Sequence, residues 1–241
     1  MAVAGSMTRF RRTYEQYWHT RLSAESLDQY GSPSPNEILE SVAAVLKKGG
    51  RILDVGCGNG AIAEITTNRF DQLHGCDFSE TALQEASQRG AAVVCADLNA
   101  EFLPYRDGSF DCVTCLEVIE HVFDPLRLLR ELHRILKDHG QLVLTTPNIR
   151  YFRNILTLVW QGRFPHTTTD TFVWGGGHLH YFTRKDVRSL LHEAEFDRCQ
   201  FVVNVEQFER SWKRRLVAKM AGMDAFGEWI CGGITVSAHK R

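Results

Sequence analysis

The chain has 241 residues, 44% of them hydrophobic and 24% charged, which predicts a single domain over residues 1–241 with one sizeable core. Its formal net charge of −1 excludes a global electrostatic field that would attract nucleic acid or an anionic membrane. Because no apolar stretch approaches the roughly 20 residues that span a bilayer and no apolar signal segment opens the chain, we expect a cytoplasmic protein with no nucleic-acid partner, no transmembrane segment and no peripheral membrane contact.

The first part of the chain predicts an arm and a helix. Residues 1–31 are expected to form a loosely helical N-terminal arm that carries several aromatic side chains. A helix over residues 35–48 should follow, because a serine and a proline precede its first turn and two glycines follow its end.

Strands and helices alternate from residue 51 to residue 147. This alternation predicts a parallel, doubly wound sheet with helices on both faces. The strands are expected at 51–55, 73–77, 91–97, 110–116 and 141–147, and the helices at 61–70, 80–89 and 125–137.

Residues 148–182 interrupt the alternation with aromatic residues and glycines. We interpret them as a partly helical insertion on the substrate side, over the carboxyl edge of the sheet where ligands bind. Their aromatic side chains would form either an apolar roof over a substrate or a small satellite core. A capping box at Thr183 should start a helix through Glu195, and strands at 201–208 and 233–239 would complete a seven-stranded sheet.

The seven cysteines are scattered along apolar segments, which is typical of reduced, buried thiols. Only Cys112 and Cys115 form a C-x-x-C pair, and they lie in an expected strand, where residues three apart point to opposite faces. We therefore expect neither a metal site nor a redox site at this pair.

The segment ILDVGCGNG, residues 52–60, follows an apolar strand with three alternate glycines. A phosphate-binding loop needs a lysine and a hydroxyl after the last glycine, where this chain has Ala61 and Ile62, and a dinucleotide loop spaces its glycines differently. Asp54, two residues before Gly56, would repel a pyrophosphate but could accept hydrogen bonds from a cationic amino group. The loop is therefore expected to hold a zwitterionic ligand.

Two further aspartates are expected at neighbouring strand ends. Asp77 ends the second strand, where a carboxylate is suited to bridging both hydroxyls of a ribose. Asp97 ends the third strand, where it could accept a hydrogen bond from an adenine amino group beside Leu98. Amino acid, ribose and adenine in this order predict S-adenosylmethionine as the ligand.

The chain from about residue 36 to residue 206 resembles the class I S-adenosylmethionine-dependent methyltransferases. The resemblance is carried, in order, by LDVGCGNG, HGCD, ADLNAEFLPYRDGSFDCV, TCLEVIEHV and LRELHRILKDHGQLVLTTPN. It implies a Rossmann-like α/β fold with a seven-stranded, mostly parallel sheet, helices on both faces and an insertion after the fifth strand. It also implies transfer of a methyl group from S-adenosylmethionine, with S-adenosylhomocysteine as the product.

The expected cofactor-binding residues follow from the motifs and the resemblance. The glycine loop would approach the methionine part of the cofactor, and the segment after the fourth strand would line both cofactor and substrate. The N-terminal arm would fold over the cofactor or, as the alternative, simply dock its aromatics on the core. The expected residues are Asp54, Gly56, Cys57, Gly58, Asp77, Phe78, Asp97, Leu98, Leu116 and Glu117, with Trp18 and Arg21 from the arm.

The stretch LEVIEHV, residues 116–122, offers Glu117, Glu120 and His121, which would share one face of a helix, and His178 follows much later. The pattern resembles small-RNA 3′-terminal 2′-O-methyltransferases, in which two glutamates and two histidines hold a metal, and a similar stretch occurs in ubiquinone-pathway O-methyltransferases. Three interpretations stay open: a divalent metal site, metal-free base catalysis by His121 or His178 as catalytic residue, and a structural role.

These features predict an enzyme that transfers a methyl group to an oxygen of a small-molecule acceptor. The first alternative is a metal-dependent RNA 3′-terminal 2′-O-methyltransferase, against which the balanced net charge argues. The second is an accessory protein, because TTPNIRYFRNILTLVWQGRFP is similar to the MetW family of methionine biosynthesis, which acts with a partner acyltransferase.

Overall fold

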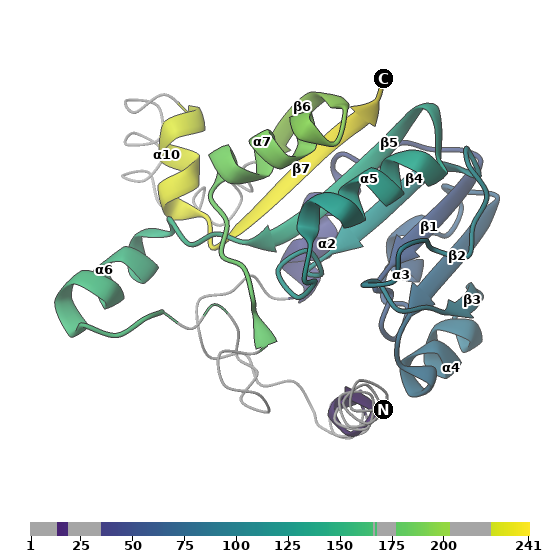
Figure 1. The fold of residues 1–241 in the computed structure, drawn as a ribbon, viewed down its shortest axis with the longest axis horizontal. Helices are drawn as coiled ribbons and strands as arrows, with labels where there is room; N and C mark the ends of the chain where they lie inside the picture. The colour runs from purple at the N-terminus through teal and green to yellow at the C-terminus, as the bar shows by residue number, and fades with distance from the viewer. Residues whose placement is uncertain (1–13, 19–34, 166, 168–176, 203–222) are drawn as a thin grey trace.

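The computed structural model describes residues 14–18, 35–165, 167, 177–202 and 223–241. Strands and helices alternate along the chain, as Figure 1 shows. The helices are α2 (Pro35–Ala43), α3 (Ala63–Thr66), α4 (Glu80–Gln88), α5 (Pro125–Ile135), α6 (Phe152–Gln161), α7 (Arg184–Glu193) and α10 (Met223–Ile230). The strands are β1 (Arg51–Val55), β2 (Gln72–Asp77), β3 (Ala92–Cys95), β4 (Phe110–Leu116), β5 (Leu136–Pro147), β6 (Phe196–Val202) and β7 (Gly233–Lys240).

The strands of the described residues form one seven-stranded sheet in the order β3-β2-β1-β4-β5-β7-β6. Strand β7 pairs antiparallel with β5 and β6, and the pairs among β1 to β5 are parallel. The predicted mostly parallel sheet is therefore confirmed. The chain leaves β1 toward β2 and β3 and then returns to β4 on the other side of β1, so the carboxyl ends of β1 and β4 form the switch point where such sheets bind ligands.

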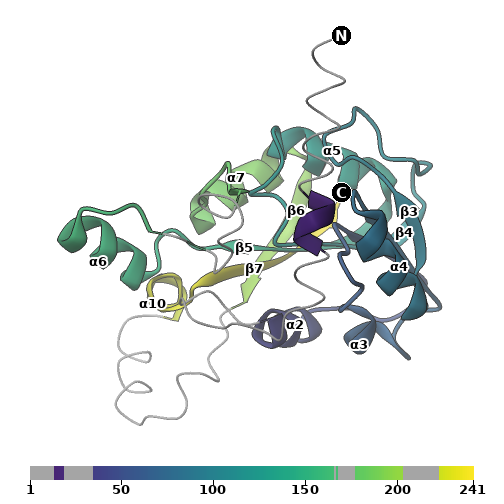
Figure 2. The same ribbon diagram turned by 90° about the horizontal axis from the view of Figure 1, so that it is seen from below.

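Helices cover both faces of this sheet. Figure 2 shows α5 and α7 on one side of it and α2 and α3 on the other. The larger apolar cluster joins α5 and α7 to one face, through buried residues such as Leu129, Leu132 and Leu191. The smaller cluster packs Val42 and Leu46 against Ile52 on the opposite face.

The two cysteines of the C-x-x-C pair lie on opposite faces of β4, as predicted. Cys112 belongs to the apolar cluster under α2, and Cys115 belongs to the cluster under α5 and α7. Both thiols are free and buried. Burial also raises the pKa of each thiol, so these cysteines are inert core residues.

Several element boundaries differ from the sequence expectations. The helix expected over 35–48 ends at Ala43, the helix expected over 61–70 is the short α3, and β3 stops at Cys95, two residues before Asp97. The strand expected at 201–208 was misplaced, because β6 begins at Phe196, and residues 203–208 lie outside the described part of the chain. Glu195, two residues after the end of α7, takes a left-handed conformation with φ 65°, so the chain turns there without the glycine that would have signalled the end of the helix.

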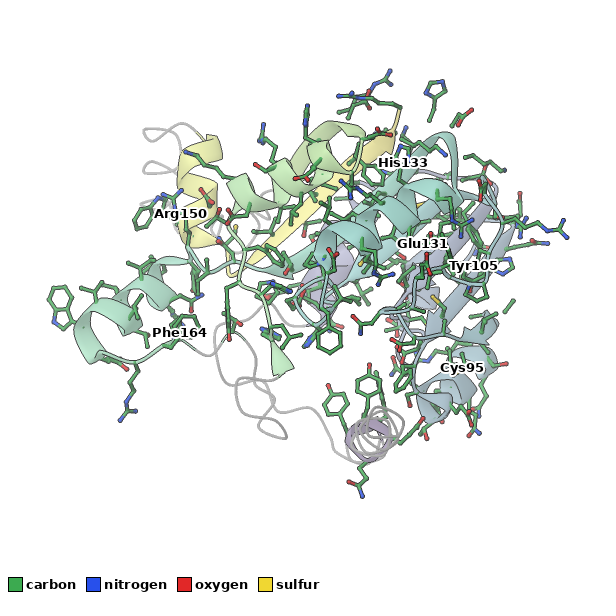
Figure 3. All side chains as sticks on the ribbon, in the orientation of Figure 1. Cys95, Tyr105, Glu131, His133, Arg150 and Phe164 are labelled. Atoms are coloured by element: carbon green, nitrogen blue, oxygen red, sulfur yellow. The ribbon has the colours of Figure 1, made fainter. Side chains whose placement is uncertain are left out.

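The described part of the insertion consists mainly of a projecting helix, α6, and a return segment, residues 177–182, which leads to α7. Helix α6 has no buried residue and extends away from the sheet in both views (Figures 1 and 2). Trp160 is 83% exposed, and Phe164, labelled in Figure 3, is exposed and contacts Tyr181 at 4.7 Å between ring centroids. Helix α6 therefore does not pack on the sheet, and residues 168–176 of the insertion lie outside the described residues.

The base of the insertion is fixed to α10 by a buried amide. The Asn148 side chain donates to the backbone oxygens of Glu228 and Cys231 at 2.6 and 2.9 Å. The Glu228 carboxylate in turn accepts from Arg150 Nη1 at 2.8 Å and from the backbone N–H of Arg184 at 3.0 Å. Figure 3 shows Arg150 between α6 and α10. These contacts fix where the chain leaves β5 and where it begins α7.

Candidate functional site

The glycine loop after β1 is tied to the end of β2. The N–H groups of Gly56 and Cys57 donate to the carbonyl oxygen of Cys76 at 2.8 and 3.0 Å. Gly56 and Gly58 have φ values of 71° and 49°, a conformation that side chains disfavour. A Cβ on Gly56 would also lie 2.4 Å from Val118 Cγ2, so the loop needs glycine there to approach the turn after β4.

The carboxylate of Asp77 is held in part by the glycine loop, beside which it is expected to bind the ribose of the cofactor. The carboxylate is buried at the end of β2, where Oδ2 accepts from Gly58 N–H at 3.0 Å and Oδ1 accepts from Ser79 N–H at 2.9 Å. Burial raises the pKa of Asp77, although the N–H groups of Ser79 and Gly58 act in the opposite direction. The carboxylate is thus held in a defined orientation at the carboxyl edge of the sheet, and its role in binding ribose stays a prediction.

Asp54 has a partner that the sequence did not reveal. Its register neighbour on β4 is Thr114, whose hydroxyl donates to Asp54 Oδ1 at 2.7 Å. Burial raises the pKa of Asp54 to about 7 despite this hydrogen bond, and the charge of Asp77 raises it further. Because the protein stabilises the ionised form of Asp54 so little, a cationic ligand beside it would favour that ionised form.

Other expected cofactor residues lie after β2, after β3 and in the described segment 14–18. Asp97 lies beyond β3, where its Oδ1 accepts from Asn99 N–H at 2.8 Å, and Leu98 packs at the edge of the larger apolar cluster. Phe78 follows Asp77 directly, and its ring lies 6.4 Å from that of Tyr14 in the arm. Trp18 is buried against Gly58, since a Cβ there would lie 2.5 Å from the Trp18 ring. Arg21 lies outside the described residues.

The segment after β4 is a turn and not the helix that the spacing suggested. Glu117 has φ 55°, and its N–H donates to the carbonyl oxygen of Thr145 at 3.1 Å. A left-handed conformation is unfavourable for a glutamate, and residues held in this way cluster at functional sites. The turn continues with a hydrogen bond from His121 N–H to Val118 O at 2.9 Å.

This turn and the return segment of the insertion bring three ligand-type side chains together. One ligand atom each from Glu120, His121 and His178 lies within 4.8 Å of the others. The rings of His121 and His178 are 4.6 Å apart between centroids. The backbone oxygen of Glu120 accepts from Leu179 N–H at 2.8 Å and fixes the return segment beside the turn. Glu117, the fourth predicted ligand, is not part of this group of three.

Glu120 is a buried carboxylate with one oxygen unsatisfied among the described residues. Its side chain is 1% exposed; Oε2 accepts from the Thr146 hydroxyl at 2.9 Å, and Oε1 has no hydrogen-bond partner there. Burial and then the charge of Glu117 raise the pKa of Glu120 well above its usual range. Burial also raises the pKa of Glu117 to about 7, and its Oε1 likewise lacks a partner within the described part of the chain. A bound cation would compensate both carboxylates.

The two histidines have different surroundings. His178 is half-buried, and its Nδ1 lies 2.7 Å from the Thr167 hydroxyl, while His121 is exposed with Nδ1 3.2 Å from Gly177 O. Burial and then the nearby His121 lower the pKa of His178 to about 4. His178 is therefore neutral at pH 7, the state in which an imidazole binds a metal or accepts a proton.

Four threonines support the site, and sequence reasoning missed all of them. Their partners come from distant segments, so neither spacing nor composition marks them. Only the position of Thr114 opposite Asp54 would have followed from a known strand register. The four are Thr114, Thr145, Thr146 and Thr167.

The strand order with an antiparallel β7, the glycine loop and the acidic strand ends define the class I S-adenosylmethionine-dependent methyltransferase fold. A family model described as a methyltransferase domain matches residues 27–200. The chain therefore belongs to this methyltransferase-domain family.

Curated relatives share part of the chain. It is 33% identical over 150 residues to the ubiquinone biosynthesis O-methyltransferase of Pseudomonas aeruginosa (strain LESB58), covering 59% of this chain and 62% of that protein. The corresponding protein of Ralstonia nicotianae is 31% identical over 150 residues, covering 60% of this chain and 62% of its own length. The match thus spans less than two thirds of these relatives.

Solved structures share the fold at lower identity. An S-adenosylmethionine-dependent methyltransferase from Mesorhizobium loti has a TM-score of 0.61 and 23% identity, covering 83% of this chain and 96% of that chain. Phosphoethanolamine N-methyltransferase 2 of Haemonchus contortus, in complex with S-adenosylmethionine, has a TM-score of 0.58 and 20% identity. The match covers 87% of this chain and 53% of that chain. Within the described residues, no helix is long and apolar enough to cross a membrane.

Proposed function

We propose that this methyltransferase acts on a hydroxyl oxygen of a small molecule and that a divalent cation at Glu120, His121 and His178 holds the acceptor. The observation that carries the proposal is the cluster itself, in which a buried glutamate lies together with two imidazoles and one of its carboxylate oxygens has no hydrogen-bond partner in the described chain. A carboxylate with imidazoles is a ligand set for Mg²⁺ or Mn²⁺. The ubiquinone biosynthesis O-methyltransferases among the relatives support an oxygen acceptor.

The cluster is suitably placed for methyl transfer to an acceptor beside the cofactor. Val118, in the same turn as Glu117 and Glu120, contacts Gly56 of the glycine loop. Asp54 and Asp77 would orient the amino-acid and ribose parts of the cofactor, which supplies the activated methyl group. The protein then contributes mainly by positioning the acceptor oxygen in line with the methyl group and by excluding water.

The side chains of the cluster have separable roles in this proposal. Glu120 and His178 would hold the cation, which when bound lowers the pKa of a coordinated hydroxyl. Thr146 and Thr167 orient these two ligands through their hydroxyl contacts, at 2.9 Å to Glu120 and 2.7 Å to His178. His121 is exposed at the mouth of the cluster, where it can either complete the ligand set or accept the proton that the acceptor loses.

The proposal predicts a preference for acceptors with two adjacent oxygens, because such a pair chelates a cation. Methyl transfer from labelled S-adenosylmethionine should therefore be detected with a catechol, be lost with EDTA and return with Mn²⁺ or Mg²⁺. The matched resorcinol, whose hydroxyls are not adjacent, should react at least about tenfold more slowly. If methyl transfer is undiminished in EDTA, the reaction does not need a cation, and base catalysis by the histidines is favoured instead.

Two further arms of the same assay address the alternative functions. An RNA oligonucleotide with a 3′-terminal ribose diol should not outcompete the catechol, and if it does, the acceptor is RNA. Absence of transfer to every acceptor, with cofactor binding intact, would favour the accessory function. Co-purification with an acyltransferase would then be expected.

A further inference from the structure

The carboxylate of Glu15 connects the N-terminal arm to helix α4. Glu15 Oε1 accepts from the backbone N–H of Glu80 at 2.8 Å, and Oε2 accepts from the Ser79 hydroxyl at 2.8 Å and from Thr81 N–H at 3.3 Å. These donors are the N-cap and the first residues of α4, whose N–H groups have no partner within the helix. One side chain thus provides three hydrogen bonds between segments more than sixty positions apart.

The helical segment 14–18, which Glu15 fixes in this way, lies over the glycine loop after β1. Figures 1 and 2 both show the helical segment 14–18 beside α4. Trp18 is 9% exposed and contacts Gly58, while the Tyr14 ring lies 6.4 Å from Phe78. The residues under the arm are therefore those directly after β1 and β2, where the cofactor is expected.

The contacts of the arm coincide with those of the ribose-binding acid. Trp18 contacts Gly58, and Glu15 contacts Ser79. The N–H groups of these same two residues hold the two oxygens of Asp77, at 3.0 and 2.9 Å. Any movement of the arm therefore acts on the two residues that orient Asp77.

We infer that Glu15 is a positioning residue that holds the helical segment 14–18 over the expected cofactor site and thereby sets how fast the cofactor product leaves. While these hydrogen bonds are formed, segment 14–18 covers the glycine loop and stabilises the orientation of Asp77. When the three hydrogen bonds of Glu15 break, Trp18 can withdraw from Gly58, and the product is free to dissociate. Burial acts against the charge of Glu15, but the hydrogen bonds from Ser79, Glu80 and Thr81 outweigh it and lower the pKa, so the carboxylate is ionised at neutral pH.

The test is the dissociation rate of S-adenosylhomocysteine, measured by displacing the labelled compound with an excess of unlabelled compound. Charge-assisted hydrogen bonds are stronger than neutral ones, so Glu15→Gln and Glu15→Ala should each accelerate dissociation by about tenfold or more. Glu85→Gln removes a charge from the same helix away from its first turn, and it should change the rate less than about twofold. Trp18→Ala should accelerate dissociation as well, and adding Glu15→Gln to it should have little further effect.

A purely structural role of Glu15 gives a different result. If Glu15 only caps α4, both substitutions lower the melting temperature and leave the dissociation rate within about twofold of the wild type, which would overturn the inference. Additive effects of Trp18→Ala and Glu15→Gln would also overturn it, because the two residues would then not act on one lid. The measurement uses neither an acceptor nor a cation, so it is independent of the proposed function.

Discussion

At the scale of single residues, the site contains side chains that lower the stability of the folded protein when no ligand is bound. Asp54 and Glu120 are buried carboxylates, and Glu117 combines a left-handed conformation with an enclosed carboxylate oxygen. Each of these features costs stability unless a ligand compensates it. Such residues are expected where a protein binds cations, here the ammonium group of the cofactor and the proposed divalent ion.

Asp54 predicts a pH dependence with a definite sign. Its pKa is about 7 in the folded chain against 3.8 as the model-peptide value, so between these pH values the folded state binds a proton that the unfolded state has lost. The free energy of unfolding should therefore fall as pH rises from about 4 to about 7, by at most about 4 kcal/mol from this group. Asp54→Asn should remove this fall, as denaturant titrations at several pH values would show.

The same residue should affect cofactor binding in the opposite sense. The affinity for S-adenosylmethionine should increase as pH rises through about 7, because Asp54 becomes ionised and can pair with the ammonium group. If the wild type and Asp54→Asn keep a constant difference in unfolding free energy across this range, the assignment of the charge to Asp54 is wrong.

At the scale of elements, two helices of similar length have opposite relations to the core. Helix α5 packs against one face of the sheet and buries Leu128, Leu129, Leu132 and Ile135 there, whereas α6 buries none of its residues. The sequence predicted the helix over residues 125–137, whereas for residues 148–182 it predicted only a partly helical insertion. Neither prediction says whether a helix packs on the sheet or projects from it. The difference arises from chain connectivity, because α6 lies between the Asn148 anchor and the return segment that carries His178.

A matched pair of truncations tests this contrast. Leu132 is fully buried in α5, and Leu156 is 48% exposed in α6. Leu132→Ala should lower the unfolding free energy by about 2 to 5 kcal/mol, since it leaves a cavity in the larger apolar cluster. Leu156→Ala should change it by less than about 0.5 kcal/mol. Equal losses in chemical denaturation would show that α6 packs on the protein in solution.

At the scale of the whole molecule, the sheet was predictable from the sequence, and the contacts between segments far apart in the sequence were not. Strand runs and cap residues such as Thr183 are local signals, and the structure confirms them. The start of β6 was missed because Glu195 turns the chain without a glycine. Glu15 was missed because its partners are set by how the arm packs on α4, which no local pattern encodes.

The cluster of Glu120, His121 and His178 was predicted as a set, although its geometry was not. The expected shared helical face is absent, and the group forms because the return segment pairs with the Glu120 backbone. Glu117 was expected to complete the ligand set, and it instead lies next to the group, where its charge raises the pKa of Glu120. The motif therefore identified the candidate residues, and the tertiary fold decided which of them lie together.

The most direct measurement is a titration of Mn²⁺ into the protein saturated with S-adenosylhomocysteine, followed by electron paramagnetic resonance of the free ion. We expect one bound ion per chain, with binding at least about tenfold weaker in Glu120→Gln and in His178→Ala. The control Glu101→Gln, which changes an exposed glutamate on the loop after β3, should bind as the wild type does. No binding by the wild type, or binding that both cluster variants retain unchanged, would show that Glu120 and His178 do not hold a cation.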